Sequence, residues 1–211
     1  MLDILTFRVL AGVLLGASVL LIFLSFRRPS AGRAPYVPAA IRKVPRALHG
    51  IWVLVAVLVP LAMILIAVVA PQLIYGTVLN VSFPGDLALQ LAGFALFGVA
   101  GVLLIWSDRH LGRYMVVDIA LAKGHELITT GPYAYVRHPT YTAVLLLNLA
   151  TALFSLHVVV MVNFFVVLAF ALWRSKLEEE LLASEQGFGT RHKEYVQRTG
   201  RFLPRSFRGF E

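Results

Sequence analysis

Cysteine is absent from this 211-residue chain, and charged residues are scarce. Without cysteine the chain forms no disulfide and offers no thiolate to a metal ion. His110, His125 and His138 lack the spacing of ligands on one helix face, so we expect no metal site. Only 14% of the residues are charged and 59% are hydrophobic, whereas soluble domains carry about a quarter charged residues. The composition therefore excludes an ordinary soluble domain and indicates an integral membrane protein.

Long apolar runs predict the membrane helices. A helix needs about 20 apolar residues to cross about 30 Å of hydrocarbon, and residues 4–26, 47–70 and 87–106 reach this length. A fourth run, 140–173, is too long for one helix, and we expect it to fold back near Ser155-Leu156-His157. The predicted fold is an all-α integral membrane protein with about five transmembrane helices. The last two would form a short hairpin with roughly 15 to 17 residues per arm.

The positive charges predict how the chain is oriented. The chain has 19 lysines and arginines and a formal net charge of +8. All of them except Arg8 lie between the first and second helices, between the third and fourth, or after the fifth. The positive-inside rule then places the N-terminus outside and the C-terminus in the cytoplasm. The basic balance therefore indicates topology and contact with anionic headgroups, and no nucleic-acid motif accompanies it.

A polar stretch, GPYAYVRHPTY at 131–141, directly precedes the fourth apolar run. Gly131-Pro132 is a turn signal, and a residue before proline is disfavoured in the α conformation. We therefore expect His138 to be extended and Pro139 to begin the next helix. Residues 123–138 would be an ordered non-helical loop, which near a membrane must line a cavity or be buried in protein. Its tyrosines, arginine and histidine fit either a pocket for a polar ligand or anchoring at the membrane interface.

A second polar cluster, WRSKLEEELL, continues the fifth helix past the membrane. Arg174 and Glu178 stand four residues apart, a spacing that alone indicates a solvated helix with a surface ion pair. The three adjacent carboxylates at 178–180 are unfavourable near anionic headgroups, and a cation bound to one of them would explain their position. An exposed charge run and a cation-binding cluster are therefore both open interpretations.

Taken together, these motifs resemble the isoprenylcysteine carboxyl methyltransferase family and the related membrane phospholipid methyltransferases. The resemblance covers roughly residues 105–204 and rests on His125, Leu127, GPY at 131–133, RHPTY at 137–141, Arg174, EEELL at 178–182, FG at 188–189 and TGRFLP at 199–204. The chain departs from the family pattern in its tail, where the segment before Phe188 is longer than usual and His192 replaces a common tyrosine. We divide the chain into N-terminal helices at 1–106 and a methyltransferase core at 107–211.

The resemblance implies an enzyme that uses S-adenosylmethionine (SAM), bound on the cytoplasmic side by the loop, the hairpin and the extension of the fifth helix. Carboxylates suit the amino group and sulfonium of SAM, whereas arginine and histidine suit its carboxylate. The expected cofactor-binding residues are His125, Leu127, Tyr133, Val136, Arg137, His138, Pro139, Tyr141, Glu178 and Glu179.

The expected catalytic residues are Arg174 and Arg137. Arg174 stands at the membrane boundary, where it would orient an acidic acceptor, although a snorkelling arginine is the alternative. The resemblance implies a lipophilic acceptor, a membrane lipid or lipid-anchored molecule, most readily the carboxylate of an isoprenylcysteine. A phospholipid amine or a small thiol is the alternative acceptor. A nicotinamide-dependent sterol-type reductase and a non-enzymatic membrane scaffold are the alternatives of other classes.

Overall fold

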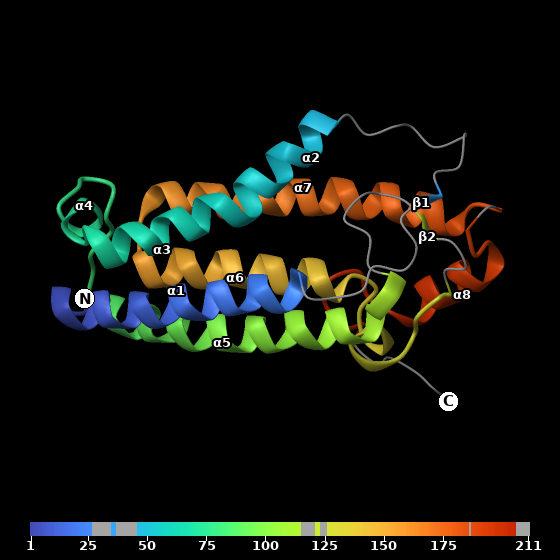
Figure 1. Ribbon diagram of the computed structural model, residues 1–211, viewed down its shortest axis with the longest axis horizontal. Coiled ribbons are helices and arrows are strands. Elements are labelled where there is room, and N and C mark those ends of the chain that lie inside the picture. The colour runs from blue at the N-terminus through green and yellow to red at the C-terminus, as the bar shows by residue number, and fades with distance from the viewer. Residues whose placement is uncertain (27–34, 37–45, 115–120, 123–125, 186, 206–211) are drawn as a thin grey trace.

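The computed structural model describes residues 1–26, 35–36, 46–114, 121–122, 126–185 and 187–205. Its elements in chain order are α1 (Ile4–Phe26), β1 (Pro35–Tyr36), α2 (Arg46–Val53), the π-helical turn η1 (Leu54–Leu58), α3 (Val59–Val69), α4 (Gln72–Tyr75), α5 (Asp86–Leu111), the 3₁₀ turn η2 (Gly112–Tyr114), β2 (Leu121–Ala122), the 3₁₀ turn η3 (Gly131–Ala134), α6 (Pro139–Ser155), α7 (Val158–Ala183) and α8 (Thr190–Arg198). The long helices form one elongated bundle, with α8 and the antiparallel pair β1–β2 at one end (Figure 1).

Among the residues that the structure describes, four helical segments are long and apolar enough to cross a membrane: Ile4–Leu24, Ala47–Val69, Asp86–Leu111 and Val158–Ala183. The prediction of a helical integral membrane protein is therefore confirmed, whereas the number of spans and the orientation stay predictions. The remaining apolar helix, α6, has 17 residues and is about 25 Å long at about 1.5 Å per residue. The chain folds back at residues 156–157 as expected. The hairpin is unequal, because α7 has 26 residues and continues beyond the apolar run.

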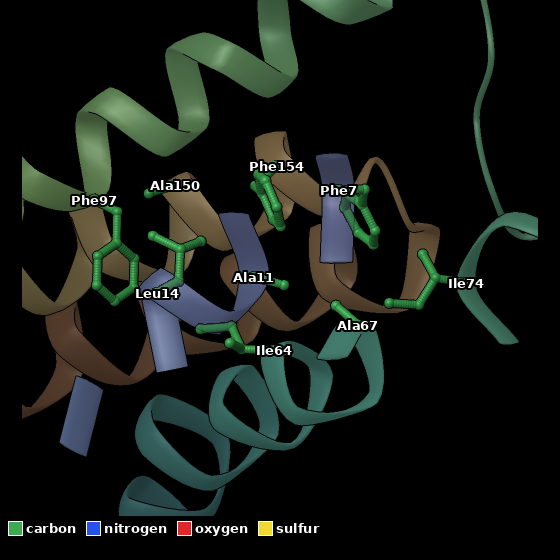
Figure 2. Packing of buried hydrophobic residues seen from close by; sticks show 9 residues of the cluster. All are labelled: Phe7, Ala11, Leu14, Ile64, Ala67, Ile74, Phe97, Ala150 and Phe154. Carbon is green, nitrogen blue, oxygen red and sulfur yellow. The ribbon is translucent and has the colours of Figure 1, made fainter. Parts of the chain in front are cut away.

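One apolar core holds α1, α3, α5 and α6 together. Its buried members, drawn in Figure 2, are Phe7, Ala11, Leu14, Ile64, Ala67, Ile74, Phe97, Ala150 and Phe154. The ring of Phe7 stacks on that of Phe154, with 4.7 Å between the centroids. Helices α5 and α6 approach closely at Gly93, where an added Cβ would lie 2.6 Å from the backbone nitrogen of Phe154. Glycine is therefore required at this helix contact.

The second apolar run contains a π-helical turn whose cause is visible in the sequence. Pro60 has no amide hydrogen, so the carbonyl of Ala56, four residues earlier, loses its α-helical donor. The amide of Val59 donates to the carbonyl of Leu54 rather than to that of Val55. Two successive carbonyls, those of Val55 and Ala56, are thus without their α-helical donors.

Asparagines from two other helices supply the missing donors. The side-chain amide of Asn148, on α6, donates to the carbonyl of Ala56 at 3.1 Å. The side-chain amide of Asn163, on α7, donates to the carbonyl of Val55 at 2.9 Å and to the side-chain oxygen of Asn148 at 3.1 Å. Because hydrocarbon offers backbone carbonyls no partner, these contacts allow the irregular turn to exist within the bundle.

The chain after α8 returns to the loop that precedes α6. The amides of Arg137 and His138 donate to the carbonyls of Gly200 and Arg201 at 2.8 and 3.1 Å. Val136 and Gly200 form a parallel β-bridge. The tail therefore pairs with the motif loop as a single short strand would.

The motif loop has the conformation that its prolines predict. Within residues 126–138 the structure contains a 3₁₀ turn at Gly131–Ala134 and no α-helix. His138 is outside the helix, with φ of −124°, and Pro139 is the first residue of α6. The prediction of a non-helical loop ending at a proline-initiated helix is confirmed for these residues, while 123–125 lie outside the described part of the chain.

Candidate functional site

Four segments that are distant in the sequence meet at one end of the bundle. They are the motif loop, the first turn of α6, the charged end of α7 and the tail after α8 (Figure 1). Their contacting polar side chains are Arg137, His138, Tyr141, Arg174, Glu178, Glu179 and Arg201. The loop and α7 lie about 40 residues apart, so the cluster is created by folding rather than by local sequence.

Glu179 is the centre of this polar cluster. Arg137 Nε donates to Glu179 Oε1 at 2.8 Å, and Arg201 Nη2 donates to Glu179 Oε2 at 2.6 Å. His138 Nε2 lies 3.3 Å from Glu179 Oε1. The side chains of Arg137, His138 and Glu179 are only 9%, 6% and 14% exposed. A carboxylate with three cationic or potentially cationic partners thus joins the loop, α7 and the tail.

Arg137 also holds the end of α8. Its Nη1 donates to the carbonyl of Val196 at 3.3 Å and to that of Thr199. These two carbonyls end α8 and begin the tail. Arg137 therefore cross-links the loop, α7 and α8, and its direct contact with a cofactor stays a prediction.

A second branch leads from His138 toward the membrane helices. His138 Nδ1 lies 3.5 Å from Glu178 Oε2, and the hydroxyl of Tyr141 donates to Glu178 Oε1. Arg174 Nε donates to the same Tyr141 hydroxyl at 3.1 Å. Arg174 is only 3% exposed. The hydroxyl of Tyr141 therefore connects a buried arginine to a carboxylate through two hydrogen bonds.

Trp52, on α2, packs against Arg174 and Tyr141 of this branch. The guanidinium of Arg174 lies over the indole ring at 5.6 Å from the centroid, a cation–π geometry. The indole also meets the ring of Tyr141 edge to face at 5.5 Å. The N-terminal helices thus contribute a side chain to the polar cluster.

The protonation states of two loop residues follow from this packing. Burial acts to lower the pKa of His138, but hydrogen bonds and charge from Glu178 and Glu179 outweigh it and raise the pKa above its ordinary value. The imidazolium can then donate from both ring nitrogens to the two carboxylates. Burial raises the pKa of Tyr133 to about 12, so its hydroxyl stays protonated near neutral pH.

The structure brings six of the sequence-predicted residues into one connected cluster: Arg137, His138, Tyr141, Arg174, Glu178 and Glu179. Tyr133, Val136 and Pro139 are buried beside it, and the hydroxyl of Tyr133 is 3.5 Å from Thr140 Oγ1. Leu127 is half-buried in the loop, and His125 lies outside the described residues. Which of these residues bind a cofactor stays a prediction.

The alternative interpretations fit only some of the residues. Burial of Arg174 and its hydrogen bond to Tyr141 are inconsistent with a snorkelling side chain in water. Glu178 and Glu179 belong to the cluster, whereas Glu180 is exposed, as a solvated charge run predicts. Tyr135, at 55% exposed, is suited to an interfacial anchor.

Two members of the cluster were not among the predicted site residues. Arg201 stands in the TGRFLP motif, but the sequence does not reveal that its guanidinium meets Glu179. Trp52 lies inside an apolar run, where a tryptophan carries no local functional signal. Both contacts depend on tertiary packing between segments far apart in the chain.

Residues 91–184 match the isoprenylcysteine carboxyl methyltransferase (ICMT) family. The family resemblance predicted from the motifs is confirmed for this segment. No curated protein matches the chain. The ICMT segment includes the loop, α6 and the charged end of α7, and it ends before α8 and Arg201. The ICMT match and the four long apolar helices together indicate a membrane methyltransferase.

An apolar cavity of about 450 Å³ lies among α1, α2 with η1, α3, α5 and α6. It is lined by Ser18, Leu21, Ile22, Val53, Ala56, Val57, Leu58, Pro60, Leu61, Ile64, Phe97, Leu104, Val144, Leu147 and Thr151. Val53 directly follows Trp52, and Val144 lies one helical turn after Tyr141 on α6. Trp52, Tyr141 and Val144 also pack against the same buried cluster around Ala56. Two residues of the lining, Val53 and Val144, thus lie close in the chain to residues of the polar cluster.

Proposed function

We propose that this protein transfers the methyl group of SAM to the carboxylate of a lipophilic acceptor of the isoprenylcysteine type. The observation that carries the proposal is Arg174, a buried cation that donates to Tyr141, whose helix α6 lines an apolar cavity from Val144 onward. An acceptor with a carboxylate at one end and a hydrocarbon chain at the other matches these two environments. The ICMT family match supports the same chemistry.

The chemistry of the cluster suits SAM. The cofactor carries an ammonium, a sulfonium and a carboxylate, and the cluster offers carboxylates beside a histidine. Glu178 is the more accessible carboxylate, at 25% exposed against 14% for Glu179, which two arginines already balance. We therefore assign the cofactor's positive groups to Glu178 and its carboxylate to the His138 side. Leu127, Tyr133 and Val136 provide apolar surface for an adenine.

The reaction demands alignment more than proton transfer. Bound SAM supplies an electrophilic methyl group, and the attacking oxygen must approach in line with the carbon–sulfur bond. A carboxylic acid is ionised at neutral pH, so Arg174 needs only to hold and orient it. Tyr141 positions Arg174 through its hydroxyl and contacts Glu178 with the same group. An amine acceptor would be a cation at neutral pH, which Arg174 would repel.

The test is a paired measurement on Arg174→Ala. Methyl transfer from radiolabelled SAM to an S-prenylated N-acylcysteine should fall roughly ten- to a hundredfold, because a hydrogen bond to a charged group contributes about 1.5 to 3 kcal/mol. The affinity for S-adenosylhomocysteine, measured by calorimetry, should be unchanged. Lys176→Ala, an exposed cation two residues later, is the matched control.

Three results would contradict the proposal. Equal losses of turnover and cofactor affinity would place Arg174 in the cofactor pocket. Full activity of the variant would remove Arg174 from the site. Wild-type transfer to a phospholipid amine, but not to the prenylated carboxylate, would assign the protein to the other acceptor class.

A further inference from the structure

Trp52 belongs to the polar site although it lies outside the ICMT-matched segment, 91–184. Its ring is 5.6 Å from the Arg174 guanidinium and 5.5 Å from the ring of Tyr141. The indole is half-buried and packs with Tyr141 and Phe202 around the same apolar cluster. The residue therefore touches both side chains that we assign to the acceptor end of the site.

The contacts of Asn148 and Asn163 with the carbonyls of the π-helical turn, here called the asparagine anchor, connect the same three helices. Tyr141 and Asn148 are both on α6, two helical turns apart. Arg174 and Asn163 are both on α7, three turns apart. The carbonyl of Ala56 lies one turn after Trp52. Hydrogen bonds among these asparagines and carbonyls fix the relative positions of the helices and so hold the indole over the guanidinium.

The π-helical turn adds a rotation to this arrangement. A π turn inserts an extra residue into the helical repeat, which changes the direction of side chains on one side of the turn relative to those on the other. Trp52 and Val53 stand just before the turn, while Pro60, Leu61 and Ile64 stand after it and line the apolar cavity. The continuous helical segment α2–η1–α3 thus presents Trp52 to the polar cluster and Pro60, Leu61 and Ile64 to the cavity.

We propose that Trp52 is a specificity-determining residue of the acceptor site, positioned by the π turn and its two asparagines. It covers the face of the guanidinium, so an acceptor carboxylate meets Arg174 shielded from water and from hydrocarbon. Val53, the next residue, is part of the apolar lining. Trp52 therefore marks the boundary at which the acceptor's charged end must stop and its hydrocarbon must begin. The inference rests on the proposed function.

The test compares Trp52→Leu with Trp52→Phe. Leucine retains apolar bulk but removes the aromatic face, so kcat/KM for the prenylated carboxylate should fall about tenfold, which equals about 1.4 kcal/mol. Phenylalanine keeps a weaker aromatic face and should restore part of the loss. Affinity for S-adenosylhomocysteine should be unchanged in both variants. The control is Trp173→Leu, which removes a half-exposed tryptophan beside Arg174 in the sequence.

The asparagine anchor gives a second readout. Asn163→Leu leaves the Val55 carbonyl without its side-chain donor and should lower kcat/KM for the same acceptor. Asn163→Gln, which keeps an amide donor, should recover activity. The losses in Trp52→Leu and Asn163→Leu should be less than additive when combined, because both act through the position of one indole.

Binding can be followed independently of turnover. A Trp106→Phe/Trp173→Phe variant leaves Trp52 as the sole tryptophan, because the chain has three. The fluorescence emission of Trp52 in this variant should change on titration with the prenylated carboxylate and not with the corresponding carboxamide. An emission change without methyl transfer would refute the proposed function and retain Trp52 in the binding site. Normal kinetics of Trp52→Leu in an active enzyme, or equal loss of cofactor affinity, would overturn the assignment of Trp52.

Discussion

Replacing Glu179 by glutamine removes the charge at the centre of the polar cluster while preserving the shape of the side chain. Arg137, His138 and Arg201 then lose their shared carboxylate. We expect the tail after α8 to detach more often, because Arg137 and Arg201 join it to α7 through this residue. Binding of S-adenosylhomocysteine should weaken as well, since His138 is no longer held between two carboxylates.

The size of the effect follows from burial. Removing one partner of a buried ion pair costs about 3 to 5 kcal/mol, and the lower end applies because the Arg201 side chain is 36% exposed and partly screened. About 3 kcal/mol corresponds to a change of roughly a hundredfold in the ratio of docked to detached tail. The change is larger than for an exposed carboxylate, whose pairs contribute about 0.2 to 1 kcal/mol.

Limited trypsin digestion measures this ratio, because α8 and the tail contain Arg191, Lys193, Arg198 and Arg201. When opening is fast relative to cleavage, the digestion rate follows the population of the detached state. Glu180→Gln is the matched control, since Glu180 is the next residue and is exposed. Equal digestion rates for both variants, with unchanged cofactor affinity, would refute the central role of Glu179.

Three further predictions address other parts of the molecule. Because the pKa of His138 is raised in the folded protein, its stabilising contribution is complete below about pH 6.5 and is lost as the pH rises through the folded-state pKa. The stability difference between wild type and His138→Gln should shrink accordingly, and a constant difference would contradict this. Gly93→Ala should strongly reduce thermal stability in detergent, whereas Gly98→Ala, with no atom within 4 Å of the new Cβ, should not; equal stability of the two would contradict the close contact. In this cysteine-free chain, Val78→Cys should react with an impermeant reagent from outside and Leu203→Cys only after permeabilisation, and the reverse pattern would invert the topology.

The membrane helices were predictable because apolar run length determines helix length in a bilayer. The fold-back at residues 156–157 was also predictable, since the polar sequence at 155–157 interrupts a run too long for one helix. The continuation of α7 past the apolar run was predicted too, but the contacts that its charged residues 174–180 make with the loop and the tail were not. The spacing of residues in the sequence does not reveal these tertiary contacts.

The members of the polar cluster were predicted where a family motif contains the residue, and were missed where only tertiary packing brings the residue to the cluster. Arg137, His138 and Glu179 were expected together, and they meet. The four-residue spacing of Arg174 and Glu178 fits a solvated helix equally well, so the sequence left the burial of Arg174 undecided. Trp52 was missed because it contacts Arg174 across more than a hundred residues. Pro60 signals a broken hydrogen bond, but not which side chains repair it.

The pairing of the tail with the motif loop bears on the order in which the protein matures. Gly200 and Arg201 supply backbone partners to a loop that is made more than sixty residues earlier, and the Arg201 side chain supplies a partner to Glu179 on α7. A growing chain therefore completes α7 and α8 before the residues that close this end of the bundle have been synthesised. A polypeptide that stops before residue 199 would contain the whole ICMT-matched segment and all four long helices. It would nevertheless leave Glu179 without Arg201 and the loop without its strand partner.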